Sequence, residues 1–351
     1  MRLGIIGLPG CGKTTVFNAL TGNIAEVADF SPGVRRPNLG VVKVPEPRLA
    51  FLAELYQSKK VTEATVEYVD VGGLTGSAQR GKELGDTFLN HIRPVDALLH
   101  VVRNFHHPIH GPPDPLGDLG RVETELVLAD LVVVEKRLER IAAERKRGKK
   151  ENPEEVNLLE ACRESLEADI PLRNKGEMLD GPVLRGFSFL SAKPLLVLVN
   201  QPEEKNPPLP AELADWTGVA VLEIMGKLEM ELAQLAPDEA SDFMKEMGVE
   251  TLATDLVIQA SHRLLDLISF FTINEQEARA WTVRQGTSAV KAAGVVHSDM
   301  ERGFIRAEVI SCSDLERAGS YAAAQKQGLV RLEGKDYTVQ DGDVIFFRFH
   351  I

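Results

Sequence analysis

A stretch near the amino end fits the phosphate-binding pattern G-x-x-x-x-G-K-[ST] and directly follows an apolar run, Leu3-Gly4-Ile5-Ile6. Glycines in such a loop let main-chain N–H groups turn towards phosphate oxygens, and Lys13 adds a positive charge. The hydroxyl of Thr14 suits Mg²⁺. The pattern predicts a nucleoside triphosphate site, the alternative being a glycine-rich turn that binds nothing. The candidate nucleotide-binding residues are Pro9, Gly10, Cys11, Gly12, Lys13, Thr14 and Thr15.

A second motif, Asp70-Val71-Gly72-Gly73, follows the strand-like run Val66–Val69 about 55 residues beyond the phosphate loop. A carboxylate leaving a buried strand at this distance suits Mg²⁺ bound through water, and Gly73 can present its N–H group to the terminal phosphate. We therefore expect Thr14 and Asp70 to hold Mg²⁺, with Lys13 and Gly73 assisting catalysis. Taken alone, the same motif is an ordinary turn after a strand.

A third motif, Asn200-Gln201-Pro202-Glu203, lies where guanine-specific GTPases carry N-K-x-D. In those enzymes the Asp carboxylate accepts two hydrogen bonds from guanine, and this Asp is missing here. Glu203 is one carbon longer, and Gln201 lacks the stem and charge of Lys, so guanine selection is disfavoured while Asn200 can still reach a purine. A polar loop after a core strand is the alternative. The nucleotide-binding candidates here are Asn200, Gln201, Glu203, Met225 and Gly226.

The elements that must position these motifs are apolar runs alternating with helical patterns, which predict an α/β fold with a mostly parallel sheet. Ligands of such sheets bind at the carboxyl ends of the strands, where all three motifs fall. The runs are Arg2–Ile6, Leu39–Val44, Val66–Val71, Ala97–Val102, Leu195–Val199 and Val219–Ile224.

Composition restricts the function classes further. With 351 residues the chain is long enough for two or three domains, and its net charge of −12 argues against a general coat for nucleic acid or a DNA-specific protein. The three cysteines are far apart, so neither a disulfide framework nor a zinc motif is expected. No apolar run is long enough to span a membrane and no signal peptide is evident, so we expect a cytoplasmic protein.

Further motifs make the chain resemble the YchF/Obg-like ATPase family, Obg-related P-loop proteins of the translation-factor class. The similarity extends over essentially the whole chain. It is carried by Asp70-Val71-Gly72-Gly73-Leu74 with Gly76–Gly85, by Thr124–Leu131, by Arg279-Ala280-Trp281-Thr282, and by Glu301–Glu308 with Glu333–Tyr337 and Gln340–Asp343.

The resemblance implies a P-loop G domain at 1–120 and 190–265, a helical coiled-coil-like insertion at 121–189 and a β-grasp-like TGS domain at 266–351. It also implies ATP preference and ribosome binding. Helical spacing of apolar residues over Val122–Arg147, followed by Pro153–Ala168, agrees with a helical hairpin. The tip, Arg145-Lys146-Arg147-Gly148-Lys149-Lys150, is a candidate contact for ribosomal RNA phosphates or a solvated turn.

Two positions bear on catalysis. Leu74 replaces the glutamine that orients water in Ras-like enzymes, and the resemblance assigns that role to a loop histidine, His110. The family's first switch carries a threonine where this chain has Val34, so unless Ser31 or Arg35 substitutes, we expect slow basal hydrolysis.

Three functions remain open from the sequence. The first is a ribosome-associated ATPase whose nucleotide state regulates partner binding. The second is a nucleotide-gated scaffold with incidental hydrolysis, favoured by Leu74 and by the missing threonine. The third is a GTPase, which requires Asn200–Glu203 to select guanine.

Overall fold

The computed structural model describes residues 2–22, 37–71, 86–179, 181–203, 208–214, 216, 219–248 and 251–350. It divides into two compact units. The first comprises Met1–Val41 and Glu67–Val257, and the second comprises Val42–Val66 and Ile258–Ile351. Residues 42–66, which we assigned to the G domain from sequence, are thus grouped with the carboxyl-terminal unit, because β3 (Lys60–Thr62) pairs with β9 (Glu277–Arg284).

The first unit is built around a six-stranded sheet in the order β2-β4-β1-β5-β6-β7. The pairs β1–β4, β1–β5, β5–β6 and β6–β7 are parallel. β5 and β6 are buried along their whole length, which explains why both are mainly apolar, with His100 as the one polar residue inside β5 and a polar residue at the end of each strand. The bounds are β1 (Arg2–Ile6), β2 (Asn38–Lys43), β4 (Thr65–Asp70), β5 (Ala97–Arg103), β6 (Leu195–Asn200) and β7 (Ala220–Ile224).

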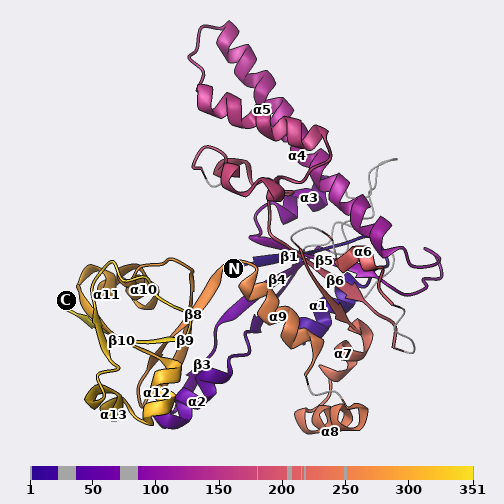
Figure 1. Ribbon diagram of the computed structural model, residues 1–351. Coiled ribbons are helices and arrows are strands. Elements are labelled where there is room, and N and C mark those ends of the chain that lie inside the picture. Colours follow the sequence, from indigo (N-terminus) through magenta and orange to yellow (C-terminus); the bar gives the residue numbers. More distant parts are fainter. Residues whose placement is uncertain are drawn as a thin grey trace. The chain divides into compact units, whose positions relative to one another are not determined.

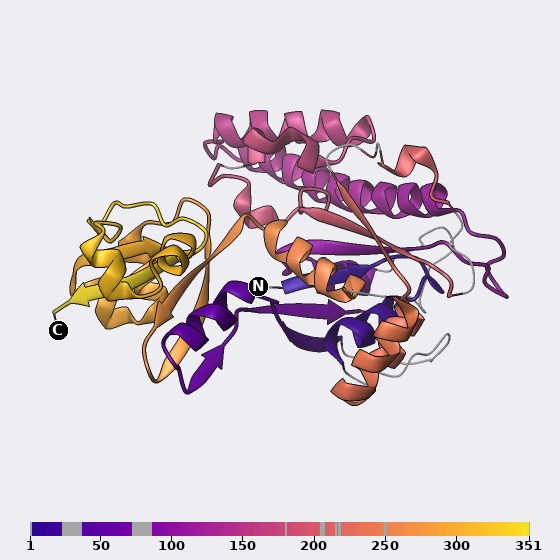
Figure 2. The same ribbon diagram turned by 60° about the horizontal axis from the view of Figure 1, so that its bottom comes forward.

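Helices cover both faces of this sheet (Figure 2). On one face, α3 and the first half of α4 contribute Phe88, Leu119, Val122 and Leu126 to a core that also contains sheet residues such as Val197. On the other face, α1 packs against α7. The helical bounds in and beside this unit are α1 (Lys13–Thr21), α3 (Asp86–Ile92), α4 (Pro115–Lys146), α5 (Pro153–Glu167), η2 (Leu172–Leu179), η3 (Arg185–Phe187), α6 (Ala211–Ala214), α7 (Gly226–Leu232), α8 (Pro237–Met247) and α9 (Ala253–Arg263).

The predicted helical hairpin is formed by α4 and α5, which Figure 1 shows projecting from the sheet of the first unit. Val127, Val134 and Ile141 recur every seven residues along α4 and are buried in one apolar cluster with Leu159 and Cys162 of α5. A repeat of seven keeps the apolar stripe facing the partner helix. Each helix begins at a proline preceded by an Asp or Asn that caps its first turn.

The second unit also contains a six-stranded sheet, in the order β11-β10-β12-β8-β9-β3. β8 and β9 form an antiparallel hairpin, β12 pairs parallel with β8, and α10 buries Ala289, Ala292 and Ala293 against the sheet. This arrangement is β-grasp-like. The bounds are α2 (Pro47–Leu55), β3 (Lys60–Thr62), β8 (Leu267–Ile273), β9 (Glu277–Arg284), α10 (Ala289–Val296), α11 (Ser298–Arg302), β10 (Phe304–Ser311), α12 (Cys312–Ala318), α13 (Tyr321–Lys326), β11 (Arg331–Glu333) and β12 (Asp343–Phe349).

The predicted fold class is therefore confirmed: a P-loop α/β domain with a helical hairpin insertion and a β-grasp-like carboxyl-terminal domain. No helix in the described parts of the chain is both long and apolar enough to cross a membrane. Cys11, Cys162 and Cys312 are buried free thiols.

Candidate nucleotide-binding site

The phosphate loop runs from the end of β1 into the first turn of α1. Gly10 and Gly12 have φ of 73° and 95°, in the left-handed region that favours glycine. A side chain would also collide at both positions, since a Cβ on Gly12 would lie 2.3 Å from Asn200 Nδ2 and one on Gly10 would lie 2.7 Å from His110 Cδ2. Gly12 precedes α1 without a side-chain cap, so the first N–H groups of the helix face the loop as a ready anion site.

Lys13 is almost fully buried beside this loop. Its ammonium group donates hydrogen bonds to the carbonyl oxygens of Gly7, at 3.0 Å, and Leu8, at 2.9 Å. Both acceptors belong to the loop itself, so the positive charge stays where phosphate oxygens would be received. Cys11, the central loop residue, has its pKa raised by burial and remains a neutral thiol.

Thr14 and Asp70, the two predicted Mg²⁺ residues, are brought together from α1 and β4. Thr14 Oγ1 donates to Asp70 Oδ2 at 2.9 Å, and Asp70 is 1% exposed. Asn38 Nδ2 donates to the same carboxylate oxygen at 3.4 Å. A hydroxyl and one carboxylate fit Mg²⁺, which takes few protein ligands and keeps several waters. Among the described residues there is no cluster of three or more His, Cys, Asp or Glu side chains that could hold a metal.

Asn200 joins the phosphate loop to the start of α7. Its Nδ2 donates to the carbonyl of Cys11 at 3.1 Å, and its Oδ1 accepts from the N–H of Gly226 at 3.1 Å. A Cβ on Gly226 would lie 2.9 Å from Asn200 Oδ1, so glycine is required there for this approach. The Asn200 side chain, which we expected to reach the purine, thus holds two segments of the site together, and it also lines the cavity beside the phosphate loop.

Gln201 and Glu203 differ in their surroundings. Gln201 is buried, with its Nε2 donating to Glu223 at 2.6 Å and its Oε1 accepting from Asn104 at 3.0 Å. Glu203 is exposed and forms an ion pair with Lys227 at 3.3 Å. Of the two, only Glu203 keeps its polar atoms on the open side of the site.

A cavity of about 410 Å³ opens beside the phosphate loop. This volume is within the range of small-molecule sites, roughly 300–1,000 Å³. Its lining combines the loop, the third motif and an aromatic ring that we did not predict from sequence, Phe105. The lining residues are Gly12, Thr15, Phe105, His106, Asn200, Gln201, Pro202, Glu203 and Lys227.

The segment between β5 and α4, residues 105–112, is called here the histidine loop. It is closed by two hydrogen bonds between the backbones of His107 and Gly111, of 3.0 and 2.8 Å. The rings of His107 and His110 are 4.7 Å apart, and both approach the Cβ position of Gly10. His110, the predicted catalytic histidine, is exposed. Its ring lies over the phosphate loop at Gly10.

Several predicted positions lie outside the described residues: Gly73, Leu74, Ser31, Val34 and Arg35. Met225 precedes Gly226 and forms the N-cap position of α7. Asn38, Asn104 and Phe105 were missed by sequence reasoning. Of these, only Asn104 could have been suggested by its position, because it directly follows the carboxyl end of β5 and ligands bind at such ends.

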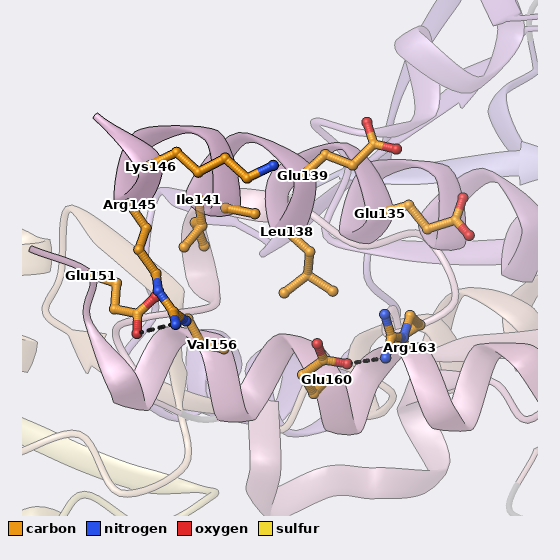
Figure 3. Close-up of a pocket in the computed structure, with 11 residues that line it drawn as sticks. Glu135, Leu138, Glu139, Ile141, Arg145, Lys146, Glu151, Val156, Glu160 and Arg163 are labelled. Carbon is orange, nitrogen blue, oxygen red and sulfur yellow. Dashed lines mark ion pairs between the residues drawn. The ribbon is translucent and has the colours of Figure 1, made fainter. Parts of the chain in front are cut away.

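A larger cavity, of about 770 Å³, lies between α4 and α5 near the tip of the hairpin (Figure 3). Leu138, Ile141 and Val156 form its apolar part, while the ion pairs Arg145–Glu151 and Arg163–Glu160 border it. It contains no glycine loop and mixes four glutamates with three cations. This groove therefore lacks the features of a polyphosphate site.

Comparisons with known proteins agree with this geometry. Residues 2–142 match the sequence family described as 50S ribosome-binding GTPase, and residues 267–350 match the family YchF-GTPase_C, described as a protein of unknown function. Ribosome-binding ATPase YchF of Bacillus subtilis (strain 168) is 40% identical over 364 residues, with 100% of both chains covered. Its namesake from Haemophilus ducreyi is 41% identical over 363 residues, covering 100% of this chain and 99% of the other.

Solved structures give the same result. The Schizosaccharomyces pombe YchF GTPase superposes with a TM-score of 0.85 at 31% identity, covering 99% of this chain and 97% of that chain. A GTP binding protein from Pyrococcus horikoshii OT3 shares the fold, with a TM-score of 0.62 at 18% identity. With full-length relatives near 40% identity and a YchF structure that superposes with a TM-score of 0.85, the chain belongs to the YchF family.

Proposed function

We propose that this chain is an ATPase that binds ribosomes, hydrolyses ATP slowly and changes its affinity for the ribosome with its nucleotide state. The observation that carries the proposal is the phosphate loop between β1 and α1, with Lys13 buried in it and Thr14 bonded to Asp70. The names of the relatives, ribosome-binding ATPase, support the choice of nucleotide and partner.

The base side of the site supports the proposed preference for ATP over GTP. A guanine clamp needs a short carboxylate facing the N1–H group and the exocyclic amine of guanine, whereas here the longer Glu203 is paired with Lys227 and the Gln201 amide is bonded to Asn104 and Glu223. The ring of Phe105 in the same cavity offers a face for a purine. A carboxylate that can accept one hydrogen bond suits the exocyclic amine of adenine.

Hydrolysis needs a positioned water and neutralised phosphate charge. His110 over Gly10 is the group we assign to water positioning, with Lys13 and the Gly73 N–H at the terminal phosphate. Mg²⁺ held by Thr14 and through water by Asp70 would neutralise charge on the phosphates. Leu74, which directly follows this motif in the sequence, can neither donate nor accept a side-chain hydrogen bond to the attacking water, so the expected basal rate is low.

Ribosome binding is assigned to the tip of the hairpin, where five exposed basic residues follow one another within Arg145–Lys150. Arg145 lies 3.6 Å from the carboxylate of Glu151, and Lys149 lies 3.8 Å from that of Glu144. Lys146, Arg147 and Lys150 form no ion pair with a residue that the structure describes. Exposed cations on a projecting helix suit RNA phosphates. We further propose a cytoplasmic location and a TGS identity for residues 266–351.

Phosphate release with and without purified ribosomes tests this function. We expect ATP turnover to rise several-fold with ribosomes and GTP turnover to stay lower under both conditions. Tight, nucleotide-dependent ribosome association without any stimulation would favour the scaffold instead. Faster turnover of GTP than of ATP would establish a GTPase and remove the role given to Glu203.

A further inference from the structure

Arg103, the last residue of β5, is 5% exposed and directs its guanidinium group into the histidine loop. Nη1 donates to the carbonyl oxygens of Phe105, at 3.1 Å, and Gly111, at 2.9 Å. Nη2 donates to the carbonyl oxygens of His110, at 3.1 Å, and Pro112, at 3.0 Å. One buried side chain thus supplies donors to four carbonyl groups of an eight-residue loop.

The remaining contacts inside the loop are short-range. His107 Nδ1 accepts from the N–H groups of Ile109, at 3.2 Å, and His110, at 3.3 Å. Ile109 and His110 are exposed, so little apolar burial holds this turn in place. Among the hydrogen bonds that the structure describes for this turn, those from Arg103 join it to the buried end of β5.

The charge of Arg103 is balanced by the first turn of α4. Asp118, which is 3% exposed, places its Oδ2 3.6 Å from Arg103 Nε, and its Oδ1 accepts from Arg121. Removing Asp118 would leave the buried Arg103 guanidinium without this counter-charge, which is destabilising locally, whereas Asp118 would keep its ion pair with Arg121 if Arg103 were removed. The same guanidinium thus connects the end of β5, the histidine loop and the base of α4.

We propose that Arg103 is the positioning residue that sets the His110 imidazole over the phosphate loop, with Asp118 as its counter-charge; this rests on the proposed ATPase function. A guanidinium suits the task because its planar fork reaches acceptors on two sides at once. A lysine at the same place has one nitrogen and cannot span four carbonyl groups. Arg103 acts through His110 and need not touch the nucleotide.

The test compares Arg103→Gln and Arg103→Lys with a matched control, Arg173→Gln. Arg173 is also largely buried and pairs with α4 through Glu123, but it makes no contact with the histidine loop among the described residues. We expect Arg103→Gln to lower kcat about 100-fold, since small misplacements of catalytic groups cost that much. Arg103→Lys should lower kcat less than Arg103→Gln does. In Arg103→Gln, Arg103→Lys and Arg173→Gln alike, the Kd for ATP should change less than about threefold.

A double-mutant cycle shows whether Arg103 acts through the histidine. We expect Arg103→Gln to add almost nothing in a His110→Ala background. An additive loss, or an equal loss of kcat in Arg173→Gln, would overturn the proposal while leaving the ATPase assignment standing. If His110→Ala alone leaves kcat unchanged, the catalytic role proposed for His110 and the positioning role of Arg103 both fail.

Amide hydrogen exchange gives a readout that does not require hydrolysis. Exchange at Ile109 and His110 should rise at least tenfold in Arg103→Gln and stay unchanged in Arg173→Gln. Asp118→Asn serves as a milder variant if Arg103→Gln does not fold, with a smaller rise in the same segment. Unchanged protection of residues 105–112 from exchange in both Arg103→Gln and Asp118→Asn would overturn the positioning role of Arg103.

Discussion

At its first turn α4 buries Asp118 between Arg103 and Arg121, whereas its last turn carries Arg145 and Lys146 in solvent. The two ends are about 48 Å apart along the helix axis, at 1.5 Å for each of its 32 residues. The buried charges have fixed partners and define a local geometry. The exposed charges are available to an external partner, and their number matters more than their exact positions.

The two cavities repeat this contrast. The cavity at the phosphate loop is bordered by Asn200 and Gln201, whose amides are already bonded within the protein. The groove between α4 and α5 is bordered by exposed ion pairs such as Arg163–Glu160. A substitution at the phosphate-loop cavity should therefore have a large and specific effect, whereas one at the groove between α4 and α5 should have a small and graded effect.

The largest effect is expected for Lys13→Ala. Hydrogen bonds to charged groups contribute about 1.5–3 kcal/mol, so the affinity for ATP should fall roughly 10- to 100-fold. Fluorescence competition with a labelled ATP analogue would measure it. Lys193→Ala is the control, because Lys193 is half-buried in the same unit and donates to the carbonyl of Val95. Equal losses in the two variants would deny Lys13 a specific role.

The next effect concerns pH and His100. Burial, with Arg173 and Lys13 nearby, lowers the pKa of His100 to about 3. In the unfolded chain this pKa is about 6.5, so below that pH the unfolded state binds a proton that the folded state does not. The unfolding free energy should therefore fall by about 2 kcal/mol between pH 7 and pH 5 through this group.

Urea denaturation at both pH values measures this contribution. In His100→Leu the decrease between pH 7 and pH 5 should be smaller than in the parent chain by about the same amount. A decrease of equal size in the two proteins would mean that His100 does not contribute to the pH dependence.

At the tip of the hairpin, the expected effects are smaller and depend on salt. Replacing Lys146, Arg147 and Lys150 by Gln should weaken ribosome association several-fold and reduce its salt dependence. Each lost phosphate contact lowers the slope of log K against log salt by roughly 0.9 for duplex nucleic acid. Pelleting assays at several salt concentrations would measure this. If Lys136→Gln, on the same helix, had the same effect as the triple variant, the tip would not be the contact surface.

The smallest effect is expected within the hairpin itself. Arg137 and Glu155 form a two-point ion pair, with distances of 2.7 and 3.0 Å, and Arg137 is 30% exposed. Arg137→Ala should cost at most about 1 kcal/mol and leave the affinity for ATP unchanged, because partly exposed pairs contribute little. A double-mutant cycle with Glu155→Ala measures the coupling free energy between Arg137 and Glu155. A coupling above 3 kcal/mol would contradict the graded behaviour assigned to this end.

Local patterns predicted much of the fold. The strands of the first sheet were predicted to within one or two residues, helped by β5 and β6, which are buried throughout and are mainly apolar apart from His100 and the residue that ends each strand. The hairpin was predicted from the helical spacing of apolar residues over Val122–Arg147 and from the returning pattern over Pro153–Ala168, and of those apolar residues Leu126 and Ile141 are buried. In the second unit β9 was missed because Glu277–Arg284 has no continuous apolar run, although its partial alternation of buried and more exposed residues fits a strand with one buried face.

The candidate site was predicted only in part, because its remaining contacts join residues far apart in the chain. Asn200 bonds Cys11 across 189 positions, and Asn38 reaches Asp70 from a neighbouring element. The burial of Arg103 at the end of β5, and its bonds to the loop that follows, depend on how that loop folds back. Residue spacing alone carries no information on such contacts.

Titration calorimetry of the full chain with ATP and with GTP, in the presence of Mg²⁺, tests the central claim most directly. The account predicts that ATP binds about tenfold more tightly than GTP or better, a difference of about 1.4 kcal/mol or more. It also predicts that Thr14→Ala weakens both nucleotides in Mg²⁺ more than in its absence. Equal affinities, tighter binding of GTP, or no heat with either nucleotide would contradict it.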